Sequence, residues 1–242
     1  MHKFGIIGMG KMGQAITAIL SGEINFQFET FNRLSVDNLS LLKACDVVIE
    51  FTTPDAAPGI IKQCIESGIP IVSGTTGWQE YHLHSISKLC QIKHGKFLYA
   101  SNFSIGMNIT FALNRRLALI MNHYPQFSAS IKEIHHIHKK DSPSGTAHTL
   151  IGDIVDQHRR YTDFELRNDE NAGEDSILPV HAIREGEVKG YHEVTWTSDS
   201  EKITLSHEAF DRKIFAEGAI MAAGWLIDQK PGVYTMRDII EL

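Results

Sequence analysis

The sequence contains little cysteine, and its cysteines do not form a recognisable set. The three residues Cys45, Cys64 and Cys90 are scattered along 242 residues, with spacings that match neither a zinc site nor a redox pair. An odd number of scattered cysteines excludes a disulfide framework and is typical of a reducing compartment. We therefore expect a cytoplasmic protein.

Long apolar runs, long charge runs and low-complexity tracts are also missing. The first apolar run, Phe4–Ile7, breaks at Gly8 and is too short for a signal peptide, and no apolar segment has the length of a membrane span. The formal net charge is −6, which makes the chain a poor candidate for nucleic-acid binding. With 43% hydrophobic and 21% charged residues, the composition is that of a globular protein.

The first hundred residues alternate between strand and helix patterns. Strands are expected at Phe4–Ile7, Phe26–Phe31, Asp46–Phe51, Pro70–Ser73 and Phe97–Ala100. Helices are expected at Gln14–Leu20, Ala56–Ser67 and Gln79–Gln91. Strands separated by helices predict an α/β fold with a Rossmann-type, doubly wound parallel sheet.

The pattern changes after residue 104. Helices are expected at Asn108–His123, Gly145–Arg160 and Phe215–Asp228. Strands are expected at Ser128–His138, Ile177–Arg184, Tyr191–Thr197 and Lys202–Glu208, the last three as an antiparallel meander. This predicts a second α+β domain, with a mixed, largely antiparallel sheet, over residues 105–211. Residues 1–104 and 212–242 would form the first domain.

Glycines mark the first turn as a nucleotide site. Gly8, Gly10 and Gly13 form G-x-G-x-x-G between a strand and a helix, the pattern that lets a backbone approach a pyrophosphate at a helix N-terminus. Met9, Lys11 and Met12 fill the motif and are expected to touch the same dinucleotide.

The end of the second strand predicts the choice of cofactor. Asn32 stands where an acidic residue would hold the ribose of NADH, and Arg33 can pair with the 2′-phosphate of NADPH. We expect NADPH to be at least as good a cofactor as NADH, although Arg33 could simply be a solvated surface residue.

Other loops at the carboxyl ends of strands should contact the nicotinamide half of the cofactor. They contribute Phe51, Gly74, Thr75, Thr76, Ala100, Ser101, Asn102 and Phe103. Their simpler interpretation is ordinary turn chemistry.

The segment Glu133–Ala147 combines proton carriers with an anion site. It contains three histidines, at positions 135, 136 and 138, and two lysines, and it ends in a Ser-Gly-Thr turn that opens a helix capped by Ser144. A helix start of this kind binds carboxylates or phosphates. On a strand, His135 would face the side opposite to His136 and His138, which argues against a metal site. Asp141 could orient Lys139 or fix the turn.

Taken together, these motifs resemble the 4-hydroxy-tetrahydrodipicolinate reductase (dihydrodipicolinate reductase) family over nearly the whole chain. Its most specific string is His-His-x-His-Lys-x-Asp-x-Pro-Ser-Gly-Thr-Ala, starting at His135. The resemblance implies a cytoplasmic homotetramer that uses NADPH or NADH to reduce a cyclic imine dicarboxylate in diaminopimelate and lysine biosynthesis. It also implies that the first domain binds the dinucleotide and the second binds substrate and builds the oligomer.

The resemblance also implies roles for single residues. His135 and Lys139 match the catalytic proton carriers, whereas His136, Ser144, Gly145 and Thr146 match positions that hold the substrate carboxylates. Cationic neighbours would make Lys139 a readier proton donor. Ile137 departs from the family, because an Arg is frequent at this position, and Asn32 departs by replacing an acidic residue.

Two other functions remain open. A nucleotide-sensing module without catalysis would carry the same glycine loop, and a related amino-acid dehydrogenase would share the fold. His192 and Glu193 could form an acid–base pair, or could serve as structural residues at a domain or subunit contact.

Overall fold

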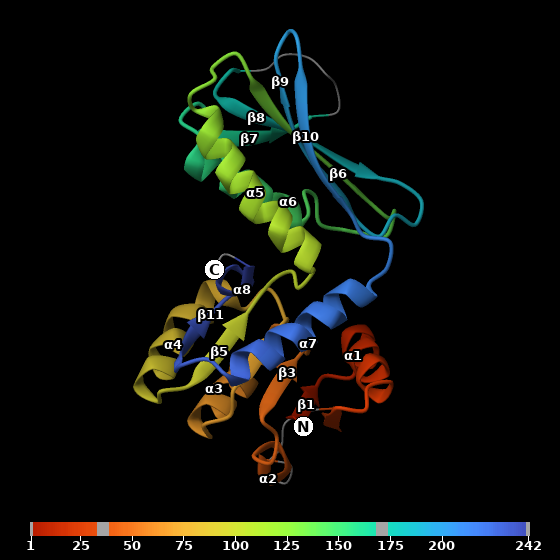
Figure 1. The fold of residues 1–242 in the computed structure, drawn as a ribbon, viewed down its shortest axis with the longest axis vertical. Helices are drawn as coiled ribbons and strands as arrows, with labels where there is room; N and C mark the ends of the chain where they lie inside the picture. The colour runs from red at the N-terminus through yellow and green to blue at the C-terminus, as the bar shows by residue number, and fades with distance from the viewer. Residues whose placement is uncertain (1, 33–38, 168–173, 241–242) are drawn as a thin grey trace. The chain divides into compact units, whose positions relative to one another are not determined.

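The computed structural model describes residues 2–32, 39–167 and 174–240. The chain divides into two compact units, Met1–Ile105 with Lys213–Leu242, and Gly106–Arg212. Each unit contains its own sheet (Figure 1).

The first unit is built on a parallel sheet with the strand order β11-β5-β4-β3-β1-β2. Every pairing in it is parallel, so the predicted Rossmann-type fold is confirmed. The order reverses beside β1, which has β2 on one side and β3 on the other; this switch point is where such sheets bind ligands. The strands are β1 (His2–Ile7), β2 (Phe26–Phe31), β3 (Val47–Glu50), β4 (Ile71–Ser73), β5 (Lys96–Tyr99) and β11 (Gly232–Tyr234).

Helices cover both faces of this sheet (Figure 1). On one face α1 (Lys11–Ser21) and α7 (Lys213–Ile227) pack against alternate strand residues such as Val47 and Ile49. The intervening Val48 faces α3 (Ala57–Glu66) and α4 (Gln79–Ile92). Burial on both faces explains why the central strands are continuous apolar runs. The short helices are α2 (Leu39–Leu42) and α8 (Met236–Ile240).

The second unit has a mixed sheet with the strand order β10-β9-β6-β8-β7. Its strands are β6 (Ser128–His135), β7 (Asp163–Leu166), β8 (Ile177–Arg184), β9 (Tyr191–Thr197) and β10 (Lys202–Glu208). The β9–β10 and β6–β9 pairs are antiparallel, whereas β6–β8 and β7–β8 are parallel. A second domain with a mixed sheet is therefore confirmed, but the predicted three-stranded meander is wrong, because β6 separates β8 from β9.

Two helices, α5 (Ile105–Met121) and α6 (Gly145–Gln157), contribute to the core on one face of the second sheet. Residues at every second position of β6 are buried, from Ala129 to His135. The predicted common face of Ile131, Glu133 and His135 is thus confirmed. The strand ends at His135 rather than at His138, and α6 ends at Gln157 rather than at Arg160.

Among the described residues, no helix is long and apolar enough to cross a membrane.

Candidate functional site

The glycine turn after β1 is shaped by close backbone contacts. Gly8 has a φ of +93°, and a Cβ there would lie 2.1 Å from the carbonyl oxygen of Phe51. A Cβ on Gly13 would lie 2.1 Å from the carbonyl oxygen of Gly8. Gly10 differs, because a Cβ there would meet no atom within 4 Å. Two glycines therefore build the turn, while the third leaves open space at the N-terminus of α1, where a pyrophosphate would be attracted.

The rest of the motif lies on the same turn. Gly10 is the N-cap of α1 and forms no side-chain cap. Lys11 is exposed, whereas Met9 and Met12 are half-buried and pack against the core of the first unit.

The loops after β3, β4 and β5 meet around the ring of Phe51. A Cβ on Gly74 would lie 2.0 Å from this ring, so only glycine fits there. Phe103 packs edge-on against Phe51 with ring centroids 5.8 Å apart. Ala100 is buried and Ser101 is exposed, while the side chain of Asn102 accepts a hydrogen bond from the backbone of Ser104 at 2.9 Å. The predicted cofactor residues of these loops therefore come together at one edge of the sheet.

A buried carboxylate ties two of these loops together, and sequence reasoning missed it. Glu50, at the end of β3, is fully buried. Its Oε1 accepts from the backbone N–H and hydroxyl of Thr52 at 2.7 and 2.5 Å and from the hydroxyl of Thr75 at 2.6 Å. Its Oε2 accepts from Ser73 at 2.6 Å. The run of hydroxyl residues that follows both strands is the sequence signal that could have revealed this network. Thr76, next to Thr75, is exposed.

Of the two residues predicted to select the cofactor, Asn32 and Arg33, the structure describes only Asn32. Asn32 is exposed and directly follows β2. Arg33 lies outside the described residues.

In the second unit, His135 contacts a buried carboxylate. Its Nδ1 lies 2.5 Å from Oε2 of Glu133, and both residues are buried. Burial alone would raise the pKa of Glu133, but hydrogen bonds from His135 and Ser144 lower it to about 2. Glu133 is therefore ionised at neutral pH and stabilises the Nδ1-protonated imidazole. A Cβ on Gly190 would lie 3.3 Å from Nε2, so this glycine leaves room beside the other ring nitrogen.

Lys139 is held by the carboxylate of Asp141, with 2.8 Å from Nζ to each oxygen. The orienting role considered for Asp141 matches this contact. Partial burial alone would raise the pKa of Asp141, but the hydrogen bond from Lys139 outweighs this and lowers it. Arg184 donates to the carbonyl oxygens of Asp141, at 2.5 Å, and Lys139, at 3.4 Å, and so supports the turn.

The helix start at Ser144 is confirmed as a cap. Its hydroxyl accepts from the N–H of Ala147 at 3.1 Å, and its own N–H donates to Oε1 of Glu133 at 3.0 Å. Ser144 is buried, Gly145 is exposed and Thr146 is half-buried. Ser144 thus fixes the turn, while Gly145 and Thr146 lie further out, at the positive end of α6.

His136 is near a second cation. Its Nε2 lies 3.4 Å from Nη2 of Arg212, and removal from water, followed by the Arg212 charge, lowers its pKa. Arg212 was not among the predicted site residues. A guanidinium only donates, so the neutral imidazole accepts from Arg212 at Nε2, and the other N–H groups of the guanidinium can bind a carboxylate.

His192 and Glu193 do not pair. They are adjacent on β9, so their side chains face opposite sides of the sheet. His192 is buried, with Nε2 3.3 Å from Oγ of Ser144, whereas Glu193 accepts from the hydroxyl of Tyr191 at 2.5 Å. The acid–base alternative for this pair is therefore wrong.

Glu133, His135 and His192 present three potential metal ligands within 4.8 Å of one another. Two ligands of one tetrahedral zinc ion stand about 3.3 Å apart. The 2.5 Å from Oε2 of Glu133 to Nδ1 of His135 is shorter than this, so these two groups contact each other directly instead of standing at the spacing of two zinc ligands.

Comparison with known proteins agrees with these features. The family described as dihydrodipicolinate reductase, N-terminus, matches residues 2–103, and the C-terminus of the same family matches residues 106–240. A 4-hydroxy-tetrahydrodipicolinate reductase from Christiangramia forsetii is 40% identical over 236 residues, which cover 97% of this chain and 96% of the relative. One from Rickettsia rickettsii is 34% identical and covers all of both chains.

Solved structures share the fold. A dipicolinate-bound dihydrodipicolinate reductase from Paenisporosarcina sp. TG-14 has a TM-score of 0.79 at 21% identity and covers 99% of each chain. An aspartate dehydrogenase from Thermotoga maritima has a TM-score of 0.53 at 13% identity, covering 95% of this chain and 98% of the other. At these identities the likeness shows the fold alone.

A Rossmann-type unit with a glycine-rich turn, joined to a unit rich in proton carriers, defines the class of NAD(P)H-dependent oxidoreductases, and this chain is one of them. Within that class, the chain belongs to the dihydrodipicolinate reductase family.

Proposed function

We propose that this protein catalyses the 4-hydroxy-tetrahydrodipicolinate reductase reaction, the NAD(P)H-dependent reduction of a cyclic imine dicarboxylate in diaminopimelate and lysine biosynthesis. The observation that carries the proposal is that one buried carboxylate, Glu133, contacts His135, the start of α6 and Arg184, which in turn binds the backbone carbonyl of Lys139. Reduction of a cyclic imine dicarboxylate requires an anion site that binds the carboxylates and a side chain that supplies a proton.

The two units take different roles in this proposal. Residues 1–104 and 212–242 bind the dinucleotide, through the glycine turn and the loops around Phe51. Residues 105–211 bind the substrate and build the oligomer. The cofactor supplies the hydride, and the protein supplies orientation and charge.

Lys139 and His135 supply and exchange the proton that balances the hydride. Hydride addition to a conjugated ring leaves negative charge on the product, which an acid must neutralise. Asp141 holds the ammonium of Lys139, and Glu133 holds the imidazole of His135. His135 is the last residue of β6, and Lys139 lies on the following turn, in which Arg184 binds the carbonyl oxygens of Lys139 and Asp141.

The substrate carboxylates are assigned to His136 and to the turn Ser144-Gly145-Thr146. The support is the electrostatic field at the start of α6 and the guanidinium of Arg212 beside His136. Ser144 shapes the turn, while Gly145 and Thr146 offer the outer groups.

NADPH is proposed to serve at least as well as NADH, because Asn32 removes the carboxylate that would repel a 2′-phosphate. Michaelis constants for both cofactors should be measured with the wild type and Arg33→Ala. A higher Michaelis constant for NADPH, with an unchanged constant for NADH, supports a contact between Arg33 and the 2′-phosphate. An unchanged Michaelis constant for NADPH contradicts it.

The quaternary state and location are proposals from the family resemblance: a cytoplasmic homotetramer. Light scattering on the purified protein should give four times the monomer mass. A monomer mass would contradict the assembly without affecting the reaction.

The decisive experiment couples the purified protein to the synthase that makes the substrate and follows the loss of reduced nicotinamide. Oxidation that depends on the synthase supports the proposal. Cofactor binding without turnover favours the nucleotide-sensing alternative. Turnover of NADP⁺ with aspartate or diaminopimelate, but none in the coupled assay, would favour a related dehydrogenase.

A further inference from the structure

Glu133 is the most highly connected carboxylate of the second unit's candidate site. Its side chain is fully buried at the centre of the sheet, on β6. Oε2 contacts Nδ1 of His135 at 2.5 Å, while Oε1 accepts from the N–H of Ser144 at 3.0 Å and from Nη2 of Arg184 at 3.1 Å. One carboxylate therefore contacts the proton carrier, the helix start and the arginine that supports Lys139.

Strand register explains why these groups meet. Glu133 lies opposite His192 on β9, and His135 lies opposite Arg184 on β8. Side chains directly across a sheet stand within about 5.5 Å of each other. The placement of Glu133, His135 and Arg184 is therefore set by the backbone pairing, whereas Ser144 comes from the turn at which α6 begins.

The contact with Glu133 determines which nitrogen of His135 carries the hydrogen. An ionised carboxylate carries no hydrogen and would repel the lone pair of a ring nitrogen 2.5 Å away, so Nδ1 holds the hydrogen. The remaining nitrogen, Nε2, is then the one that gains and loses a proton.

His192 does not compete for the charge of Glu133. Its Nε2 is 4.0 Å from Oε2, outside hydrogen-bond distance, and lies nearer to the hydroxyl of Ser144. Burial, and then the neighbouring His135, lower the pKa of His192 to about 3. His192 is therefore neutral and packs edge-on against His135, with ring centroids 5.0 Å apart.

We propose that Glu133 is a positioning residue, which holds His135 in the tautomer with its hydrogen on Nδ1 and anchors both the Ser144 turn and, through Arg184, the Lys139 turn. This inference rests on the proposed function for the role of His135, but the tautomer itself is a property of the free protein. Glu133 does not itself take part in proton transfer.

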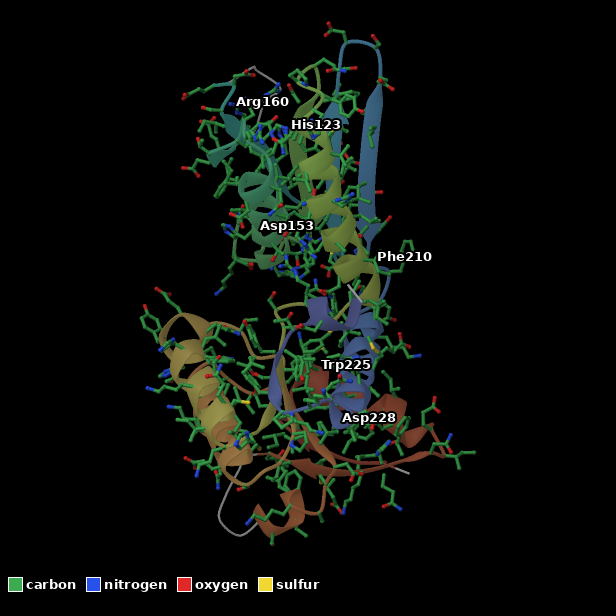
Figure 2. The ribbon with its side chains drawn as sticks, turned by 60° about the vertical axis from the view of Figure 1, so that its left-hand side comes forward. His123, Asp153, Arg160, Phe210, Trp225 and Asp228 are labelled. Atoms are coloured by element: carbon green, nitrogen blue, oxygen red, sulfur yellow. The ribbon has the colours of Figure 1, made fainter. Side chains whose placement is uncertain are left out.

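The test compares two substitutions of buried carboxylates in the same unit. Glu133→Gln keeps the size of the side chain but removes the charge that selects the tautomer. Asp153→Asn, on α6 (Figure 2), removes a carboxylate that pairs with Arg115 at 3.1 Å. Ring ¹⁵N chemical shifts report the tautomer of each histidine, and His135→Asn identifies the His135 signal.

We expect the wild type and Asp153→Asn to carry the hydrogen on Nδ1 of His135, and Glu133→Gln to show a mixture of tautomers. In Glu133→Gln kcat should fall roughly 10- to 100-fold with an altered pH profile, while the Michaelis constant for NADPH stays unchanged. Asp153→Asn should lower Tm without changing the His135 signal. Glu133→Asp should recover part of kcat, since it restores the charge.

Two results would overturn the inference. One is a wild-type His135 with its hydrogen on Nε2, a measurement that remains decisive even if Glu133→Gln does not fold. The other is a folded Glu133→Gln variant with unchanged tautomer and kcat. If the wild type lacks reductase activity, the proposed function fails, and the tautomer measurement still decides the role of Glu133.

Discussion

At the scale of single residues, the proposed chemistry depends on two side chains that are each held by a carboxylate. His135 is held by Glu133, and Lys139 by Asp141. We predict that His135→Ala or Lys139→Ala lowers kcat by roughly 100-fold or more, because general-acid function is lost. Steady-state kinetics in the coupled assay measure this.

Lys140→Ala is the matched control, since Lys140 is the exposed neighbour of Lys139. It should keep kcat close to that of the wild type. Near-normal turnover in both the His135 and Lys139 variants would remove these residues from the mechanism.

Sequence reasoning found the residues that are close in the chain and missed the residues that support them. Glu133 and His135 could be placed on one face because they are two positions apart on a strand. Arg184 and His192 lie on strands about 50 residues further along, and only the pairing of β6 with β8 and β9 brings them to Glu133. No local pattern reports such a pairing.

At the scale of elements, the same distinction explains the predicted fold. The ends of β2, β8, β9 and β10 were predicted to the residue, because alternation and turn residues are local signals. The strands β7 and β11 were missed because neither is a buried apolar run: β7 is mostly exposed and β11 is only half-buried, whereas the equally short β3 and β4 are fully buried. The meander was wrong because chain order does not reveal that β6 inserts between β8 and β9.

The turn between β1 and α1 allows a prediction that separates folding from cofactor binding. Gly13→Ala places a Cβ against the backbone of Gly8 and should cost about 2–4 kcal/mol of stability. In Gly10→Ala the new Cβ meets no protein atom, so the variant should fold normally. It should bind NADPH about 10-fold more weakly, because the Cβ occupies the space that the pyrophosphate needs. Thermal unfolding and cofactor titration measure the two effects separately. A Gly10→Ala variant with full affinity would show that the pyrophosphate does not approach this position.

The loops after β3 and β4 depend on the buried carboxylate of Glu50. Glu50→Gln removes the charge and one of the two oxygens that accept these four hydrogen bonds, so we predict a loss of about 2–3 kcal/mol in the free energy of unfolding. Affinity for NADPH should fall as well, since Phe51 and Thr75 are displaced. Glu23→Gln, an exposed acid in the same unit, should change neither quantity. Wild-type stability and affinity in Glu50→Gln would show that the network is dispensable.

At the scale of the whole molecule, two buried groups make stability depend on pH in the same direction. The pKa of His192 is lowered from 6.5 to about 3 by burial and then by His135, so the folded protein binds fewer protons than the unfolded chain between those pH values. Stability should therefore fall as the pH falls through this window. Glu133, with its pKa lowered from 4.5 to about 2, adds a further loss below pH 4.5.

The His192 contribution can be isolated by substitution. Each pH unit inside the window corresponds to roughly 1.4 kcal/mol, so from pH 6.5 to about pH 5 the wild type should lose about 2 kcal/mol that His192→Gln retains. Denaturant unfolding at a series of pH values measures the slope, which is independent of any constant destabilisation by the substitution. His123→Gln, at an exposed histidine (Figure 2), should follow the wild type. Parallel curves for wild type and His192→Gln would mean that His192 titrates alike in the folded and unfolded protein, and the neutral packing of His192 against His135 would then be wrong.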